Sequence, residues 1–345
     1  MTRTITTHSS DASEHQAPDR MDSVPEAVLD VQNLHVYYQT SGGRVSAVNG
    51  VSFALGRKEV LGLVGESGSG KSTIAMALLR LIKSPGKIER GQVLLNGRDL
   101  LALSEDEMRL VRLAELAMVA QGAMNSLNPV MRVRDQIIDA WKDHDVELRG
   151  SEIDERISML MQRVGLRAED ARRYPHELSG GMKQRAVIAI AISLRPSVII
   201  ADEPTSALDV VVQRQVFDTL QQVQDEIGAS VILIGHDMGL MAQSVDRLGV
   251  MYAGEIVELS PVRDVFRNPL HPYTRLLIAS LPSLDKKGAL RGIPGMPPSL
   301  LTRPPGCPFQ PRCPMATALC ESEAPLLSLK RPNRMVACHH VDTQL

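Results

Sequence analysis

Short apolar runs bounded by glycines and polar turns occupy two separate parts of the chain. Residues 27–103 contain the runs AVLDVQNLHVYY, SAVNGVSFAL, VLGLVG and GQVLLNG, and a later group comprises SVIIAD, SVILIG and RLGVMYAG. Runs of this length between turn residues predict β-strands. A helix predicted over residues 72–81 follows a glycine-rich turn, and further helical segments separate the later strands. This alternation predicts an α/β fold with a parallel sheet.

Residues 104–174 show a different periodicity. The stretches SEDEMRLVRLAEL and SEIDERISMLMQRVG begin with acidic residues and repeat apolar side chains at helical spacing. Both features are typical of amphipathic helices. We therefore expect a helical subdomain over about residues 105–182, inserted into the strand-rich domain.

The two ends of the chain differ from this central part. Residues 1–26 are rich in Ser, Thr, Asp and His and contain few large apolar side chains, which predicts a flexible tail. Beyond residue 260 lie 14 of the 21 prolines, eight of them between Pro294 and Pro314. Such a density disfavours helices and central strands. We predict a main domain over residues 27–260 and a loop-rich C-terminal extension over residues 261–345.

Charge and composition narrow the possible functions. The chain has 38 Lys and Arg against 40 Asp and Glu, so its net charge of -2 gives no overall attraction to nucleic acid or anionic lipid. Its strongly apolar stretches, such as residues 187–194, are far shorter than the roughly 20 residues of a membrane-spanning helix. The N-terminus has no apolar core of signal-peptide type, so we expect a cytosolic protein with reduced thiols.

A glycine-rich segment, GESGSGKST, connects the run VLGLV to the first predicted helix. In this setting glycines let successive N–H groups point at one anion, and the helix N-terminus adds partial positive charge. Lys71 would reach the β- and γ-phosphates, and the Ser72 hydroxyl would ligate Mg²⁺. The pattern is that of a P-loop, and its predicted nucleotide-binding residues are Gly65, Ser67, Gly68, Ser69, Gly70, Lys71, Ser72 and Thr73.

Two acidic residues end the later run VIIADE, over residues 198–203. Asp202 and Glu203 would stand at the carboxyl edge of a parallel sheet, where ligands bind in such folds. Asp202 suits the magnesium shell, and Glu203 is placed to orient or deprotonate an attacking water. Alone, this pair would more often form a helix-capping turn, but beside a P-loop it predicts a nucleotide site.

The segment LSGGMKQR over residues 178–185 resembles the signature motif of ATP-binding cassette (ABC) ATPases, and its Ser179 stands 23 residues before Asp202. Other landmarks follow in that family's order: Gln121 resembles the Q-loop glutamine, residues 206–209 the D-loop, and His236 the switch histidine. Tyr38 resembles the aromatic residue that stacks on adenine, with neighbouring Tyr37 as the alternative.

The resemblance implies a P-loop NTPase cassette that binds ATP and Mg²⁺. It assigns catalysis to Glu203, His236 and Gln121, and magnesium to Ser72, Gln121 and Asp202. Further nucleotide contacts would come from Ser179, Gly180, Gly181, Gln184 and Asp209. In the family two cassettes pair head to tail, so that Ser179 and Gly181 of one chain cap the γ-phosphate held by its partner. ATP would then join the cassettes, and hydrolysis would release them.

The extension narrows the resemblance. The stretches NPLHPYT, IPGMPP and GCPFQPRC, with SLNP at residues 126–129, resemble dipeptide and oligopeptide importer ATPases. This implies a peripheral subunit on the cytoplasmic face of the membrane that powers peptide uptake. Its partners would be a second ATPase subunit, commonly a paralogue, two integral-membrane permease subunits and an extracytoplasmic substrate-binding protein, without nucleic acid. Around Gln121, the sequence VAQGAM departs from the importer pattern, which more often has Phe before and Asp-Pro after the glutamine.

Two alternatives to peptide import stay open at this stage. Nickel importers share much of the extension, so the same ATPase could serve nickel or another small solute. ABC proteins that act on nucleic acid or ribosomes usually carry two cassettes or long coiled-coil insertions. This chain has one cassette and no heptad run, which disfavours that class.

All four cysteines lie in the last 39 residues, as Cys307, Cys313, Cys320 and Cys338. Their irregular spacing is not that of a zinc finger or ribbon, and Cys-Pro occurs twice, a feature found beside ligands of ferredoxin-like clusters. We predict a [4Fe-4S] cluster, an arrangement that some members of the importer family resemble. The alternatives are zinc, bound by the same four cysteines or with His339 or His340 replacing one of them, and plain thiols. A metal here would be structural, because ATP hydrolysis needs no redox centre.

Overall fold

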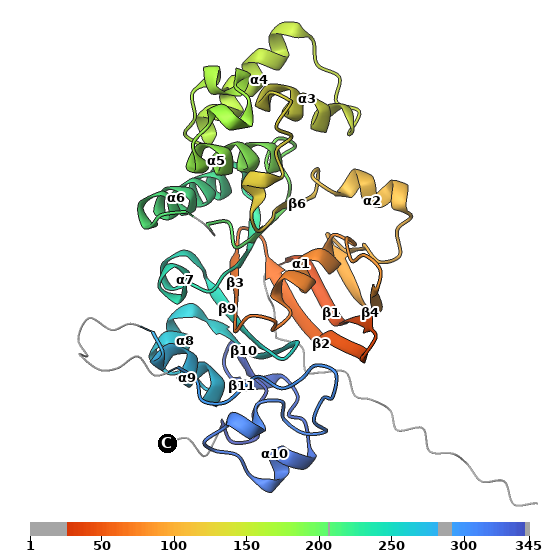
Figure 1. Cartoon of the computed structure of the whole chain (residues 1–345), viewed down its shortest axis with the longest axis vertical. Helices are drawn as coiled ribbons and strands as arrows, with labels where there is room; N and C mark the ends of the chain where they lie inside the picture. Colours follow the sequence, from red (N-terminus) through yellow and green to blue (C-terminus); the bar gives the residue numbers. More distant parts are fainter. Residues whose placement is uncertain (1–25, 206–207, 282–291, 342–345) are drawn as a thin grey trace, which may run out of the picture.

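The computed structural model of the chain describes residues 26–205, 208–281 and 292–341. The predicted N-terminal tail therefore lies almost entirely outside the described residues. Two sheets, a helical lobe and the C-terminal extension make up the described part. Figure 1 shows the helical lobe at one end, the extension at the other and the sheets between them. No described helix is long and apolar enough to cross a membrane.

The larger sheet has the order β11-β12-β10-β9-β3-β8-β7-β6. The five strands from β9 to β6 run parallel, and β10, β12 and β11 continue the sheet antiparallel. The expected parallel α/β sheet is therefore confirmed. Its strands are β3 (Val60–Val64), β6 (Leu116–Val119), β7 (Val198–Asp202), β8 (Ser230–Ile234), β9 (Arg247–Tyr252), β10 (Glu255–Pro261), β11 (Ser328–Arg331) and β12 (Arg334–Val336).

The central strands are apolar because both faces of this sheet are covered. Ile199 of β7 packs into one hydrophobic cluster and its neighbour Ile200 into the other, and both are buried. Strands covered on two sides are continuously apolar and do not alternate. Each such buried side chain contributes about 1.5–3 kcal/mol relative to an exposed one.

The smaller sheet is antiparallel, in the order β2-β1-β4-β5. Its strands are β1 (Ala27–Thr40), β2 (Gly43–Gly56), β4 (Gly86–Leu95) and β5 (Arg98–Asp99). Helix α1 (Lys71–Leu78) follows β3 and shares a buried apolar cluster with this sheet. It ends three residues before the predicted limit, where Arg80 has a φ of 53° that continues no helix.

The segment predicted as wholly helical from residue 104 also contains a strand. Helix α2 (Glu105–Val111) begins at a capping box between Ser104 and Glu107, but β6 follows and pairs with β7 in the larger sheet. The strand LAMV is too short to carry its own periodicity. The helical lobe then contains α3 (Val133–Lys142), α4 (Gly150–Arg163) and α5 (Gly180–Ala191), and two 3₁₀ turns, Ala168–Arg172 and Pro175–Glu177, connect α4 to α5.

The remaining helices precede or belong to the extension. Helix α6 (Val210–Ile227) begins at the Asp209 cap, and α7 (Met238–Ser244) follows β8. The extension contains α8 (Val262–Arg267), α9 (Pro272–Ala279) and the short α10 (Ala318–Ser322). It also supplies β11 and β12, so it is less loop-rich than predicted and is joined to the larger sheet through β10.

Candidate functional site

The glycine-rich loop between β3 and α1 has a backbone that only glycines allow. Gly65 and Gly70 have φ angles of 149° and 101°, and a Cβ atom would stand 2.1 Å from the Met251 carbonyl oxygen and 2.3 Å from that of Ala47, respectively. Gly68 also has a positive φ of 77°, but no heavy atom lies within 4 Å of its Cβ position. The loop backbone is therefore packed against the backbone of other segments at Gly65 and Gly70, whereas no other segment lies close to Gly68.

Lys71 lies inside this loop. Its Nζ donates to the carbonyl oxygens of Gly65 at 2.8 Å and Glu66 at 3.0 Å, and to Ser69 Oγ at 3.2 Å. Burial lowers the pKa of the ammonium, while the nearby Glu203 and Asp202 carboxylates oppose that shift. The ammonium is thus held by neutral oxygen atoms of the loop, which a phosphate would replace with stronger charged partners.

The adjacent residue connects the loop to strand β7. Ser72 Oγ donates to Asp202 Oδ1 at 3.2 Å, and burial raises the pKa of Asp202. A hydroxyl and a carboxylate at this distance are the oxygen ligands that Mg²⁺ prefers. Ser72 and Asp202 therefore fit the predicted magnesium site.

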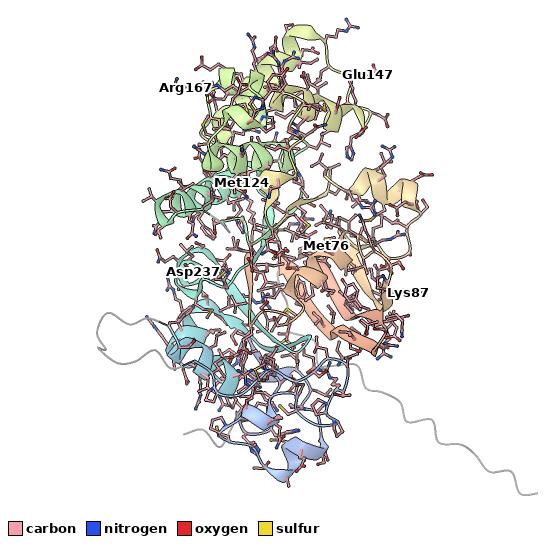
Figure 2. The ribbon with its side chains drawn as sticks, in the orientation of Figure 1. Met76, Lys87, Met124, Glu147, Arg167 and Asp237 are labelled. Carbon is pink, nitrogen blue, oxygen red and sulfur yellow. The ribbon has the colours of Figure 1, made fainter. Side chains whose placement is uncertain are left out.

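Glu203 is the centre of a second group of polar side chains. Its Oε2 accepts a hydrogen bond from Gln121 Nε2 at 2.9 Å, and its Oε1 lies 3.7 Å from His236 Nδ1. Its φ of 44° is unusual for a residue with a side chain and marks local strain of the kind common at functional sites. Gln121 follows β6, and His236 follows β8 and precedes Asp237, which is labelled in Figure 2.

The two groups meet because the sheet is parallel. Strands β3, β6, β7 and β8 are parallel, so their carboxyl ends lie at the same edge of the sheet. The residues that follow these strand ends are far apart in the sequence but meet at this edge. The sequence-predicted Lys71, Ser72, Asp202, Glu203, Gln121 and His236 are brought together in this way.

The signature residues stand on a different part of the molecule. Ser179 caps α5 by accepting a hydrogen bond from Met182 N–H at 3.3 Å, and a Cβ on Gly181 would meet Val212 at 2.6 Å. Gly180 lies against Leu208 and Met124, the latter labelled in Figure 2 below the helical lobe. Val212 lies on α6, Leu208 just before it and Met124 on the turn after β6, whereas the P-loop lies at α1 in the strand-rich part (Figure 1).

Two other predicted residues on the signature side are Gln184 and Asp209. Gln184 is buried on α5, and its Nε2 has no hydrogen-bond partner among the described residues. Asp209 caps α6 by accepting from the N–H groups of Val211 and Val212. The other predicted D-loop landmarks at residues 206 and 207 lie outside the described residues.

The two candidate adenine-stacking tyrosines have different neighbours. The Arg44 guanidinium lies 4.2 Å above the centre of the Tyr37 ring. The Tyr38 ring lies against Gly86 of β4, where a Cβ would be 2.6 Å from Tyr38 Cε1. Both tyrosines are half-buried. Arg44 therefore already covers one face of Tyr37.

The four cysteines line one small pocket in the extension, together with His339 and His340. Burial and the charges of the other three thiols raise the pKa of Cys307 to about 11. Cys320 Sγ lies 3.4 Å from His340 Nε2. Within residues 26–205, 208–281 and 292–341, however, no group of three or more His, Cys, Asp or Glu side chains has an arrangement that could hold a metal ion. The predicted iron–sulfur site is not supported by this placement of side chains.

A contact between the extension and the P-loop was not predictable from the sequence. Arg312 forms a two-armed ion pair with Glu66, and Glu66 N–H donates to the Tyr273 hydroxyl at 2.9 Å. Nothing in the local sequence marks these partners, because Glu66 and Arg312 are 246 positions apart.

Comparisons with known proteins agree with this site. The family model described as ABC transporter matches residues 48–206, and the one described as oligopeptide/dipeptide transporter, C-terminal region, matches residues 257–320. The "Dipeptide transport ATP-binding protein DppD" of Bacillus subtilis is 44% identical over 317 residues, covering 91% of this chain and 94% of that protein. The "Oligopeptide transport ATP-binding protein OppD" of Salmonella typhimurium is 44% identical over 90% of this chain and 93% of its own length.

A solved structure supports the same fold. The dimeric bacterial ABC transporter cassette MJ0796 has a TM-score of 0.61 and 26% identity, covering 68% of this chain and 99% of its own. The resemblance stated from the motifs is therefore confirmed. The chain belongs to the ABC transporter family, among the ATP-binding proteins of dipeptide and oligopeptide transport.

Proposed function

We propose that the chain is the ATP-hydrolysing subunit of an ABC importer that takes up dipeptides or oligopeptides. One observation supports the assignment as an ATPase. Glu203 accepts a hydrogen bond from Gln121 and lies next to His236. It directly follows Asp202, which accepts a hydrogen bond from Ser72 of the P-loop. The names and coverage of the peptide-transport relatives support the cargo.

The residues divide the work of phosphoryl transfer. Lys71 leaves the carbonyl oxygens of Gly65 and Glu66 and pairs with the phosphates. Ser72, Asp202 and Gln121 hold Mg²⁺, which neutralises charge on the phosphates when bound. Glu203 takes a proton from the attacking water, and His236 and Gln121 keep its carboxylate oriented.

Adenine stacks on Tyr38 in this proposal. Arg44 already covers one face of the Tyr37 ring, which favours its neighbour. An aromatic face against a base contributes about 1–3 kcal/mol in nucleic-acid complexes, and a similar contact would orient the nucleotide here.

A complete site needs a second cassette. Ser179, Gly180, Gly181 and Gln184 stand on the helical lobe, while the P-loop stands on α1, so the signature of a partner would close each P-loop. Asp209, at the α6 cap, completes this side of the interface. The dimeric state of the MJ0796 cassette supports a head-to-tail pair, and the partner of this chain is a second ATPase subunit, identical or paralogous.

The remaining partners follow from the class of transporter. Two integral-membrane permease subunits form the path for the peptide, and an extracytoplasmic substrate-binding protein delivers it. The chain sits on the cytoplasmic face of the membrane, where it docks on the permeases.

The cysteine pocket holds a structural [4Fe-4S] cluster in this proposal. The support is chemical. All four cysteines line one pocket, and the charges of the other three thiols contribute to the raised pKa of Cys307. A bound cation would remove that repulsion, and thiolates are the usual ligands of such clusters. The side chains must still move closer together, since none of the described groups is yet arranged as a metal site. Because Cys320 lies beside His340, zinc bound by three cysteines and His340 is the second candidate.

Two measurements test the proposal. The chain is co-purified anaerobically with its permease and binding-protein partners and reconstituted in liposomes. We expect ATP hydrolysis that a peptide stimulates and nickel does not, and peptide uptake that stops with Glu203→Gln. Stimulation by nickel alone would contradict the peptide assignment. Iron, sulfide and zinc analysis of the same sample shows what the cysteine pocket binds. Four iron and four sulfide per chain support the cluster, and zinc or no metal contradicts it.

A further inference from the structure

The extension holds the P-loop at one residue, Glu66. Arg312 donates from Nη1 to Glu66 Oε2 at 2.7 Å and from Nη2 to Oε1 at 2.9 Å. Parallel bonds of this kind fix orientation as well as distance. The Arg312 side chain is 3% exposed and that of Glu66 28%, so water reaches the pair only from the Glu66 side.

The backbone of Glu66 is held as well. Its N–H donates to the Tyr273 hydroxyl at 2.9 Å, and its carbonyl oxygen accepts from Lys71 Nζ at 3.0 Å. Four groups therefore hold Glu66. Arg312 and Tyr273 belong to the extension, Lys71 is the lysine that binds phosphate, and the Ser69 N–H donates to the same carbonyl oxygen at 3.2 Å.

Arg312 is itself fixed by packing. It donates to the Tyr252 hydroxyl at 3.1 Å and from Nε to the Pro294 carbonyl oxygen at 2.8 Å. The Tyr252 ring packs edge-on against Phe309 at 5.2 Å. With its rotamer held in this way, the guanidinium loses little further freedom when it binds Glu66.

The turn that presents Arg312 begins and ends at cysteines of the pocket. Gln310 N–H donates to the Cys307 carbonyl oxygen at 3.0 Å, and Cys313 N–H donates to the Gln310 carbonyl oxygen at 3.2 Å. Arg312 directly precedes Cys313. A shift of either cysteine must therefore move the guanidinium relative to Glu66.

We propose that Arg312 is a positioning residue of the ATP site, through which the cysteine pocket sets the affinity of the P-loop for ATP. Arg312 holds Glu66, and Glu66 fixes the start of the turn from which Lys71 reaches the phosphates. The inference rests on the proposed function. Because coupling between two sites is reciprocal, bound ATP stabilises the arrangement of the pocket in return.

A double-mutant cycle on the full chain tests the positioning role. Binding of Mg-ATP is measured by calorimetry for the wild type, Arg312→Gln, Glu66→Gln and the double variant. We expect each single variant to raise Kd about tenfold, as for the loss of a charge-assisted pair, and the double variant to be no weaker than either. Arg312→Lys should recover only part of the affinity, because an ammonium does not reproduce the two-armed contact.

The split of kinetic parameters separates positioning from general damage. Steady-state hydrolysis should show a higher KM for Arg312→Gln with kcat changed less than twofold, because Arg312 does not touch the reacting atoms. The matched control is Arg334→Lys, which alters another ion pair of the extension without contact to the P-loop. Equal loss of ATP affinity in that variant would show that a loosened extension, and not the Arg312 contact, causes the effect.

A second cycle tests the connection to the pocket. Cys313→Ala should raise the Kd for Mg-ATP in the wild-type background but not in Arg312→Gln. If Cys313→Ala does not fold, Cys307→Ala, at the other end of the same turn, takes its place. Additive effects of the cysteine and arginine changes would overturn the connection. A wild-type chain without ATP affinity would overturn the proposed function itself, whereas normal wild-type binding with unchanged affinity in Arg312→Gln would overturn only this inference.

Discussion

Ser72 Oγ donates a hydrogen bond of 3.2 Å to Oδ1 of Asp202 and so ties the first turn of α1 to the end of β7. The carboxyl group is buried, and this burial raises its pKa above the value in the unfolded chain. Folding in the absence of Mg²⁺ and nucleotide therefore works against the ionised form. Sites that bind cations commonly accept such a cost in the empty state.

The first prediction concerns Asp202→Asn in the chain without nucleotide. A group whose folded pKa is raised loses stability as pH rises from the unfolded pKa through the folded one. The variant lacks this loss, so its Tm at neutral pH should exceed that of the wild type by roughly a few degrees. The difference should vanish in acid, below both pKa values. Thermal unfolding between pH 3 and 8 measures it.

Asp225→Asn is the control for Asp202→Asn. Asp225→Asn makes the same chemical change on an exposed position of α6 and should leave Tm almost unchanged at pH 7. Mg-ATP should raise the Tm of the wild type but not that of Asp202→Asn. A variant that is less stable than the wild type at pH 7 would contradict the argument from burial.

The second prediction concerns Glu203→Gln. The amide keeps the size of the side chain next to Gln121 and His236 but cannot accept a proton from water. We expect ATP affinity within a few-fold of the wild type and turnover lower by about 10²–10⁴, the usual contribution of a general base. Single-turnover hydrolysis and ATP binding measure the two quantities. Glu226→Gln, on the exposed side of α6, is the control, and ordinary turnover in Glu203→Gln would exclude this base.

Local motifs explain how much of the site was predictable. The P-loop, the Asp202–Glu203 pair and His236 each follow a buried strand, and parallel strands bring their carboxyl ends to one edge. The sequence pattern therefore predicted both the residue types and their meeting place. The comparisons confirm the ABC family, while the roles of the individual residues stay predictions.

Contacts between distant segments explain what was missed. Strand β6 has four residues and takes its place from pairing with β7, which no local periodicity shows. Strands β11 and β12 have only four and three residues, and their addition to the larger sheet through β10 depends on tertiary contacts. The Glu66–Arg312 pair joins segments 246 positions apart in the same way.

The third prediction compares two glycines of the P-loop. Both Gly68 and Gly70 have positive φ angles, so alanine at either position costs about 1–2 kcal/mol of backbone strain. Alanine at Gly70 would also stand 2.3 Å from the Ala47 carbonyl oxygen, whereas alanine at Gly68 meets nothing within 4 Å. Urea unfolding should therefore show a loss of at least about 3 kcal/mol for Gly70→Ala and a clearly smaller loss for Gly68→Ala. Equal losses would mean that φ alone decides both positions.

The fourth prediction concerns the ion pair that anchors the extension to the larger sheet. Glu258 of β10 is fully buried, and its carboxylate accepts from Arg334 Nη2 at 3.2 Å and from the N–H groups of Leu270 and His271. Arg334→Met leaves that carboxylate buried without its cation, which should cost about 3–5 kcal/mol of unfolding free energy. Arg98→Met, which breaks an exposed ion pair with Glu115, should cost at most about 1 kcal/mol.

The partner change sharpens this fourth prediction. Adding Glu258→Gln to Arg334→Met removes the unpaired charge but keeps a side-chain oxygen for the N–H groups of Leu270 and His271. The double variant should therefore recover part of the stability lost in Arg334→Met, because a neutral buried acceptor costs less than an uncompensated charge. Urea unfolding of the wild type, Arg334→Met, Glu258→Gln and the double variant gives the coupling energy between the two side chains. A double variant less stable than Arg334→Met would contradict this expectation. It would show that the hydrogen bonds from the Leu270 and His271 N–H groups to a charged carboxylate stabilise the fold by more than the unpaired charge destabilises it.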